Sequence, residues 1–176
     1  MRADAERNRT AILAVAGRLI CEEQRVDVSM DEIAAAAAVG KGTLFRRFTD
    51  REGLIRAVFD DRTCRAWDRA RDIAADTAVP AGDRIVAYVA AVFDLCSGLQ
   101  PLLRALPEGC HARTWGPWQA LLAELIAEAA PEADAEFLAL AVFACLRPEI
   151  TAAISGPRHR AGVLALTARL LGPDRS

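Results

Sequence analysis

Apolar residues recur at spacings of three and four along nearly the whole chain, the spacing that places side chains on one face of an α-helix. Runs of β-branched residues are short and alanine is abundant, so strand signals are nearly absent. The pattern therefore predicts an all-α protein of about nine helices. The helices are expected over Asp4–Glu23, Met30–Ala36, a short segment after Gly40, Arg51–Ala75, Arg84–Ser97, Leu102–Ala105, Pro117–Ala129, Glu132–Ser155 and Arg158–Leu171.

Several residues have the chemistry that starts or interrupts a helix. Ser29 followed three positions later by Glu32 has the spacing of a capping box, so a helix is expected to begin there. Gly98 and Pro101 are expected to end the helix that precedes them. Pro148 removes one backbone donor, and we expect it to kink or interrupt the helix that contains it.

Composition indicates a globular protein of the cytoplasm. The 176 residues suffice for one compact domain, or for a small module fused to a larger one. The five cysteines are odd in number and form no C-x-x-C pair, so neither a disulfide framework nor a zinc site is expected. The longest uncharged apolar run, Phe137 to Leu146, is about half of a membrane span, and no signal peptide is visible. We expect no membrane segment, no metal and no cofactor.

Charge is distributed unevenly along the chain. The formal net charge is −2, yet residues 38–56 carry five basic side chains against two acidic ones. Lys41 lies in this window and is the only lysine among 22 basic residues. A local basic excess indicates an anionic partner, and a solvated basic helix face is the alternative.

The window coincides with two short predicted helices joined by a tight turn, the arrangement of a helix-turn-helix. Leu44 and Phe48 are four residues apart and can pack inward with Ile33 and Leu54. This leaves the basic side chains of the second helix outward. A phosphate-binding P-loop is the competing interpretation of GKGT, but its spacing requires a glycine six residues before Lys41 and Ser or Thr directly after it. Alanine and glycine stand there instead.

The stretch SMDEIAAAAAVGKGTLFRRFTDREGLIRAVF, together with NRTAILAVAGRLICEE ahead of it, resembles the N-terminal region of the tetracycline-repressor (TetR) family of bacterial transcription regulators. The family pattern is close to T-x-x-x-I-A-x-x-A-G-V-S-x-G-T-L-Y-x-H-F-x-x-K-x-x-L. The resemblance implies a DNA-binding domain of three helices over residues 1–50, with the helix-turn-helix at about 29–48. It also implies a helical effector-binding and dimerisation domain over 51–176.

The motif match assigns DNA contact to eight residues. They are Ser29, Lys41, Gly42, Thr43, Phe45, Arg46, Arg47 and Arg51. Ordinary roles compete with this assignment, because Arg46 and Arg47 could be solvated charges and Thr43 could cap or pack. Arg7 and Arg9 are candidates for an arm that reaches the DNA backbone or minor groove, and surface charge is the alternative for both.

This chain departs from the family pattern at several positions. Phe45 replaces a tyrosine whose hydroxyl reaches a phosphate, so one phosphate bond is expected to be missing. Arg47 and Arg51 replace His and Lys and keep cationic contact. Ala38 replaces the turn glycine and Gly40 a serine, and we expect the turn to be displaced by a residue or two.

The C-terminal part is rich in apolar and aromatic residues, as small-molecule sites usually are. We expect an effector pocket for a mainly hydrophobic, uncharged ligand, although plain core packing is the alternative for each ring. The candidate pocket residues are Phe93, Cys96, Leu103, Trp115, Trp118 and Phe143.

The last two expected helices carry long apolar stripes, which favour burial against a second copy and thus a homodimer. The stripes consist of Leu138, Ala141, Val142, Cys145, Val163, Leu166 and Leu170.

Enzyme motifs are missing from the sequence. His111 and His159 are far apart, and no nucleophile or zinc motif accompanies either. Glu149 lies between apolar residues beside Arg147 and Pro148, where an ion pair or a ligand contact would explain it. The resemblance to the TetR family implies an effector-released repressor that binds a palindromic operator as a homodimer. The alternative is a helical small-molecule-binding or interaction module with a degenerate DNA-binding head.

Overall fold

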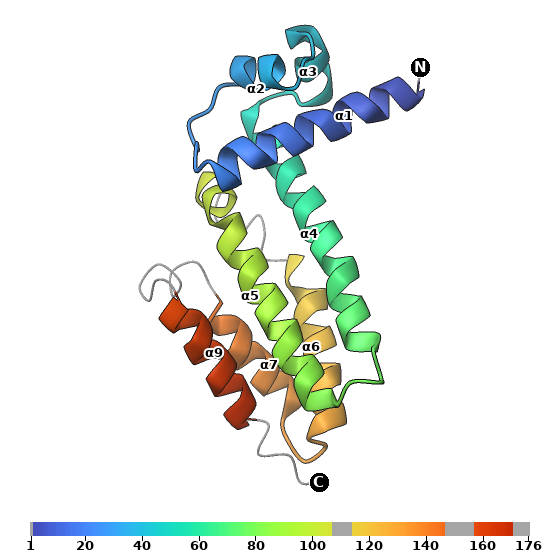
Figure 1. Ribbon diagram of the computed structural model, residues 1–176, viewed down its shortest axis with the longest axis vertical. Helices are drawn as coiled ribbons and strands as arrows, with labels where there is room; N and C mark the ends of the chain where they lie inside the picture. Colours follow the sequence, from blue (N-terminus) through green and yellow to red (C-terminus); the bar gives the residue numbers. More distant parts are fainter. Residues whose placement is uncertain (1, 107–113, 147–156, 171–176) are drawn as a thin grey trace. The chain divides into compact units, whose positions relative to one another are not determined.

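The computed structural model describes residues 2–106, 114–146 and 157–170. All regular secondary structure in these ranges is helical, which confirms the predicted fold class (Figure 1). The elements are α1 Arg2–Gly17, a π-helical turn η1 Arg18–Glu22, α2 Met30–Ala36, α3 Lys41–Arg47, α4 Arg51–Ala75, α5 Ala81–Ala105, α6 Gly116–Ala129, α7 Ala135–Ala144 and α9 Pro157–Leu170.

The chain packs as two compact units. The first unit comprises Met1–Cys64 and Gly98–Glu108, and the second comprises Arg65–Ser97 and Gly109–Ser176. The division falls inside α4 and inside α5, so each of these long helices contributes residues to both units. A functional boundary at residue 50 stays a prediction.

The first unit is built on a core of aliphatic side chains from its short helices. Helix α2 packs against both α1 and α3. Ile33, Leu44, Phe48 and Leu54, the four residues expected to point inward, are at most 6% exposed. Helical spacing alone therefore predicted which side of α3 faces the core, and the opposite side is left for a partner.

Aromatic rings of α4, α5 and α6 meet in the core of the second unit. The Tyr88 hydroxyl is fully buried and donates to the Trp118 carbonyl at 2.8 Å. Trp67 meets Trp118 edge-on, with ring centroids 5.0 Å apart. The buried guanidinium of Arg84 donates to the Ala74 carbonyl at 2.6 Å and also pairs with Glu128 of α6. These polar groups are buried with partners, as a stable core requires.

Helix α5 corrects one expectation. It runs without a break from Ala81 to Ala105 through Gly98 and Pro101, so the separate short helix expected at its end does not exist. Pro101 takes away one N–H, yet Leu99 and Leu102 on either side of it are at most 1% exposed. Burial of these side chains outweighs the local helix-breaking signal, a common result when tertiary packing opposes propensity.

Helix α5 also has the length and hydropathy of a membrane span, and half of its most apolar window is buried inside the protein. That burial is typical of a core helix, and Ile85, Tyr88 and Val92 are fully buried.

Helix α7 begins at Ala135, three residues later than expected, because the Asp134 side chain caps it by accepting from the Phe137 N–H at 3.0 Å. The kink expected at Pro148 lies outside the described residues.

Candidate DNA-binding surface and second-unit core

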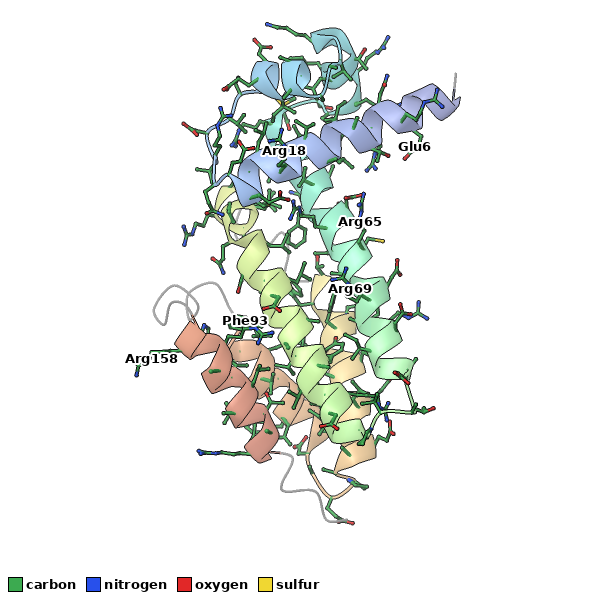
Figure 2. The ribbon with its side chains drawn as sticks, in the orientation of Figure 1. Glu6, Arg18, Arg65, Arg69, Phe93 and Arg158 are labelled. Carbon is green, nitrogen blue, oxygen red and sulfur yellow. The ribbon has the colours of Figure 1, made fainter. Side chains whose placement is uncertain are left out.

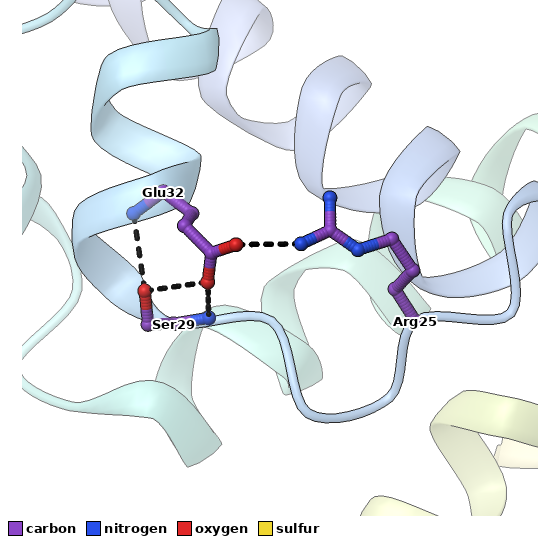
Figure 3. A network of polar contacts seen from close by, with 3 residues as sticks. All are labelled: Arg25, Ser29 and Glu32. Atoms are coloured by element: carbon purple, nitrogen blue, oxygen red, sulfur yellow. Dashed lines mark hydrogen bonds and ion pairs between the residues drawn. The ribbon is translucent and has the colours of Figure 1, made fainter.

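Helix α2, the first helix of the motif, begins with the predicted capping box (Figure 3). The Ser29 N–H and hydroxyl both donate to Glu32 Oε2, at 2.9 and 2.8 Å, and Ser29 Oγ accepts from the Glu32 N–H at 3.2 Å. Arg25 donates to the other carboxylate oxygen at 2.6 Å. These donors, the Ser29 backbone first, lower the pKa of Glu32 to about 2. The hydroxyl proton of Ser29 is thus engaged, and donating it to a phosphate would require leaving Glu32.

The turn between α2 and α3 is a Schellman motif with an alanine at its left-handed position. Ala38 has φ +52°. Its N–H donates to the Ala35 carbonyl at 3.1 Å, and the Val39 N–H donates to the Ala34 carbonyl at 3.0 Å. The expected displacement of the turn is wrong, because the left-handed residue stands where the family pattern has glycine. The backbone keeps the turn in place although an alanine there is strained.

Helix α3 presents one polar face to solvent. Lys41, Phe45, Arg46 and Arg47 are exposed, and Thr43 is partly buried. A Cβ added at Gly42 would meet no atom of the described residues within 4 Å apart from its chain neighbours and its own helix backbone. Packing inside the protein therefore does not require glycine at this position, which leaves close approach by an outside partner as a reason for it.

The cations of this surface differ in what they contact. Arg46 and Arg47 make no hydrogen bond or ion pair with any residue in the described ranges. Arg51, at the start of α4, donates to the Val26 carbonyl. Lys41 Nζ lies 2.5 Å from Asp31 Oδ2 of α2. Two cations are therefore available to an anion at once, and two are held by the protein itself.

Asp31 was not among the site residues predicted from the sequence. It lies ten positions before Lys41, and only the packing of α2 against α3 brings the two side chains together. The acidic character of the first turn of α2 was visible in the sequence, but the register between the two helices was not.

The candidate arm residues lie on α1, where Arg7 is exposed and Arg9 is partly buried. Arg7 has an interaction partner within the protein. Their contact with DNA stays a prediction.

The predicted effector residues lie mostly in the core of the second unit. Phe93, Cys96, Trp118 and Phe143 belong to one buried cluster, against which the partly buried Trp115 packs. Burial raises the pKa of the Cys96 thiol to about 12, so the thiol stays protonated. Leu103 is buried in the first unit instead.

His159 borders this cluster and was not among the predicted pocket residues. Phe93 extends from α5 toward α9 (Figure 2), and its ring meets His159 edge-on with centroids 5.1 Å apart. His159 Nε2 lies 3.0 Å from the Cys145 carbonyl oxygen, which can only accept, so Nε2 carries the proton. In the neutral ring Nδ1 is then an acceptor, and it is buried without a hydrogen-bond partner among the described residues. Buried polar atoms in this state are rare.

A hollow of about 690 Å³ lies between α4 and α6 in the second unit. It is lined by Asp68, Arg71, Asp72, Ala74, Ala75, Leu121, Glu124, Leu125 and Glu128. None of the six predicted pocket residues belongs to this lining.

Three further residues that the sequence analysis considered lie outside the part of the chain that the structure describes. They are His111, Pro148 and Glu149. Within the described part of the chain, no group of three or more His, Cys, Asp or Glu side chains could hold a metal ion.

Two short helices, a capped start, a tight turn and an exposed basic face together define a helix-turn-helix protein. The family described as "Bacterial regulatory proteins, tetR family" matches residues 12–58. A TetR transcriptional regulator from Streptomyces coelicolor is 30% identical, with 93% of this chain and 95% of that chain covered and a TM-score of 0.61. The chain belongs to the TetR family.

Two further proteins are similar to this chain, one in sequence over a short stretch and one in fold over nearly the whole length. An HTH-type transcriptional regulator of Staphylococcus aureus strain USA300 is 43% identical over 54 residues, which cover 31% of this chain and 29% of that protein. FadR from Bacillus subtilis, solved in complex with stearoyl-CoA, is 15% identical over 92% of this chain and 96% of its own, with a TM-score of 0.68. The first likeness covers less than a third of either protein, and the second shows the fold alone.

Proposed function

We propose that this protein is a cytoplasmic, DNA-binding transcriptional regulator, a homodimeric repressor that an effector releases from a palindromic operator. The observation that carries the proposal is the solvent-facing side of α3, where Arg46 and Arg47 are exposed and have no partner among the described residues, while Leu44 behind them is fully buried. The scaffold is thus separated from the side chains that would read DNA. The function is binding rather than catalysis, in keeping with the family.

In this proposal α3 enters the major groove. Arg46 and Arg47 reach phosphates or guanine edges, because a guanidinium can bind either in bidentate fashion. Thr43, half-buried at the start of the same face, contacts base edges or the backbone. Phe45 offers only apolar contact, such as to a thymine methyl group. Phosphate contacts position the helix, and base contacts select the sequence.

The homodimer is proposed to form through α7 and α9. Four large apolar side chains on these helices are at least 40% exposed: Phe137, Leu140, Leu166 and Leu170. The stripes expected from the sequence need correction, because Val142 and Val163 of those stripes are buried in the core of their own unit. The exposed set is the better candidate for contact with a second copy.

The effector is proposed to be a small, mainly hydrophobic molecule that binds the second unit near Phe93 and His159. The predicted pocket residues are packed together here, so the ligand would have to part them. The Nδ1 of His159, which has no hydrogen-bond partner in the described ranges, offers one acceptor beside apolar side chains, which suits a ligand with a single hydroxyl or N–H donor. FadR, solved with stearoyl-CoA, is a structural neighbour in which this fold takes a ligand.

Release requires the effector to prefer one conformation over another. A ligand changes DNA affinity only as far as its own affinity differs between the DNA-bound and the free protein. Equal effector affinity for the two forms would overturn this part of the proposal.

The DNA-binding proposal is tested by a mobility-shift assay of the purified protein on the DNA upstream of its own gene, at low and physiological salt. Wild-type protein is expected to give a specific shift that weakens as salt rises, because phosphate contacts release counterions. Arg46→Ala is expected to lose the shift while circular dichroism shows an unchanged helix content. If neither this DNA nor random genomic fragments are bound at low salt, the interaction module with a degenerate head becomes the better description.

A further inference from the structure

The Lys41 ammonium group already forms an ion pair within the head, the predicted DNA-binding domain of residues 1–50. Its nitrogen lies 2.5 Å from Asp31 Oδ2, and the two side chains are 68% and 55% exposed. Lys41 begins α3, and Asp31 lies in the first turn of α2. The pair therefore lies in water, and within the described part of the chain neither side chain has another charged partner.

Helix dipoles explain why this pair forms. A cation in the first turn of a helix is disfavoured by the positive N-terminal end of the dipole, and an anion there is favoured. Asp31 is favourably placed in the first turn of α2. Its carboxylate supplies the negative charge that is missing from the first turn of α3, where Lys41 lies. Arg46 and Arg47 lie in the last turn of α3, where a cation is favoured, and neither has a partner in the described ranges.

We propose that Asp31 competes with DNA phosphate for Lys41 and thereby sets the DNA affinity of the head. The inference rests on the proposed DNA-binding function. Asp31 and a phosphate oxygen are anions that need the same ammonium group, so Lys41 must leave one to bind the other. When Lys41 turns to DNA, the Asp31 carboxylate is left unpaired beside a polyanion.

The competition moderates binding without preventing it. An ion pair as exposed as this one is worth at most about 1 kcal/mol, so phosphate can displace the carboxylate. The competition also changes how steeply DNA affinity falls with salt. A free lysine that binds one phosphate steepens the slope of log affinity against log salt by about 0.9, whereas the carboxylate that Lys41 abandons takes up a cation and offsets that release.

The experiment measures DNA affinity and its salt slope for Asp31→Asn, Lys41→Ala and the double variant. The probe is a duplex selected by the wild-type protein from a random-sequence pool, and affinity is read by fluorescence anisotropy. Asp31→Asn is expected to bind roughly threefold to fivefold more tightly at physiological salt, with a slope steeper by about one. Asp60→Asn makes the same charge change at an exposed carboxylate of α4 and is expected to leave both quantities close to wild type.

The double variant tests whether Asp31 acts through Lys41. If it does, adding Asp31→Asn to Lys41→Ala brings a clearly smaller gain than adding it to wild type, because only the repulsion between the carboxylate and DNA is then removed. An undiminished gain in that background would overturn the proposal, because Asp31 would then act as a general negative charge. Unchanged affinity of Asp31→Asn would also overturn the proposal. The proposed DNA-binding function would still be supported in that case, provided that the wild-type protein selects a duplex. Failure of the wild-type protein to select any duplex would overturn both.

Discussion

Phe45 occupies the reading face of α3 with 47% of its surface exposed. A tyrosine at this position would keep the ring and add a hydroxyl that can donate to a phosphate. We predict that Phe45→Tyr tightens operator binding roughly fivefold, since a net hydrogen bond is worth about 1 kcal/mol. Anisotropy titrations on the selected duplex measure this gain. Phe45→Leu keeps an apolar side chain without a hydroxyl, and an equal gain in that variant would show that the hydroxyl is not responsible.

Ala38 is strained by its left-handed backbone, with φ +52°. A non-glycine residue in this conformation costs about 1–2 kcal/mol, and glycine recovers that cost less its own greater freedom in the unfolded chain. We predict that Ala38→Gly raises the free energy of unfolding by about 0.5–1 kcal/mol. Urea unfolding followed by circular dichroism measures the change. Ala36→Gly, at the last residue of α2, is expected to lower it instead, and the same sign for both variants would contradict the argument.

The residues of the reading face show how far sequence alone could go. Burial of Leu44 and exposure of Arg46 follow from one helical period, so both were predictable. The pairing of Lys41 with Asp31 and the bond from Arg51 to the Val26 carbonyl depend on how separate elements pack. A pattern read along one helix does not contain that information.

At the scale of the element, the capping box of α2 makes the stability of the head depend on pH. The pKa of Glu32 is about 2 in the folded protein because Ser29 and Arg25 donate to the carboxylate. This value lies below the ordinary value for glutamate, so the ionised group stabilises the folded state above pH ~4.5. That contribution is lost as pH falls through the folded pKa.

We predict that wild type is more thermostable than Glu32→Gln at pH 6, and that the difference in Tm shrinks as pH falls from about 5 toward 2.5, because Glu32 of the unfolded chain takes up a proton in this range while the folded carboxylate resists it. Thermal unfolding followed by circular dichroism across this range measures it. Glu52→Gln provides the same charge change at a carboxylate outside the capping box. A difference that stays constant with pH would refute the role of the ionised capping box.

Helix ends were predictable where local chemistry decides them, and not where packing does. Helix α2 begins at its capping box, and α4 begins after Asp50, which accepts from the Gly53 N–H at 2.7 Å. Helix α5 continues through Pro101 because long-range burial on both sides opposes the local signal. The π-helical turn η1 had no sequence signal that we recognised.

At the scale of the whole molecule, the predicted function requires two heads on one DNA. Leu166 and Leu170 are four residues apart on α9 and are 41% and 40% exposed. They therefore lie on one helix face, as members of the proposed dimer contact. Placing a carboxylate in an apolar contact leaves a charge buried without a partner, which is strongly unfavourable.

We predict that Leu166→Glu converts the dimer to a folded monomer, as measured by sedimentation. Its affinity for the palindromic duplex is expected to fall by at least about a hundredfold, because the second head no longer binds as part of the same molecule. Affinity for a single half-site should change little, since the head is untouched. Ala168→Glu adds the same charge to an exposed position about 200° around α9 and is expected to remain dimeric. If Leu166→Glu remains dimeric, or if wild type is itself monomeric when bound to DNA, the dimer contact does not lie on this face. The exposed leucines would then need another explanation.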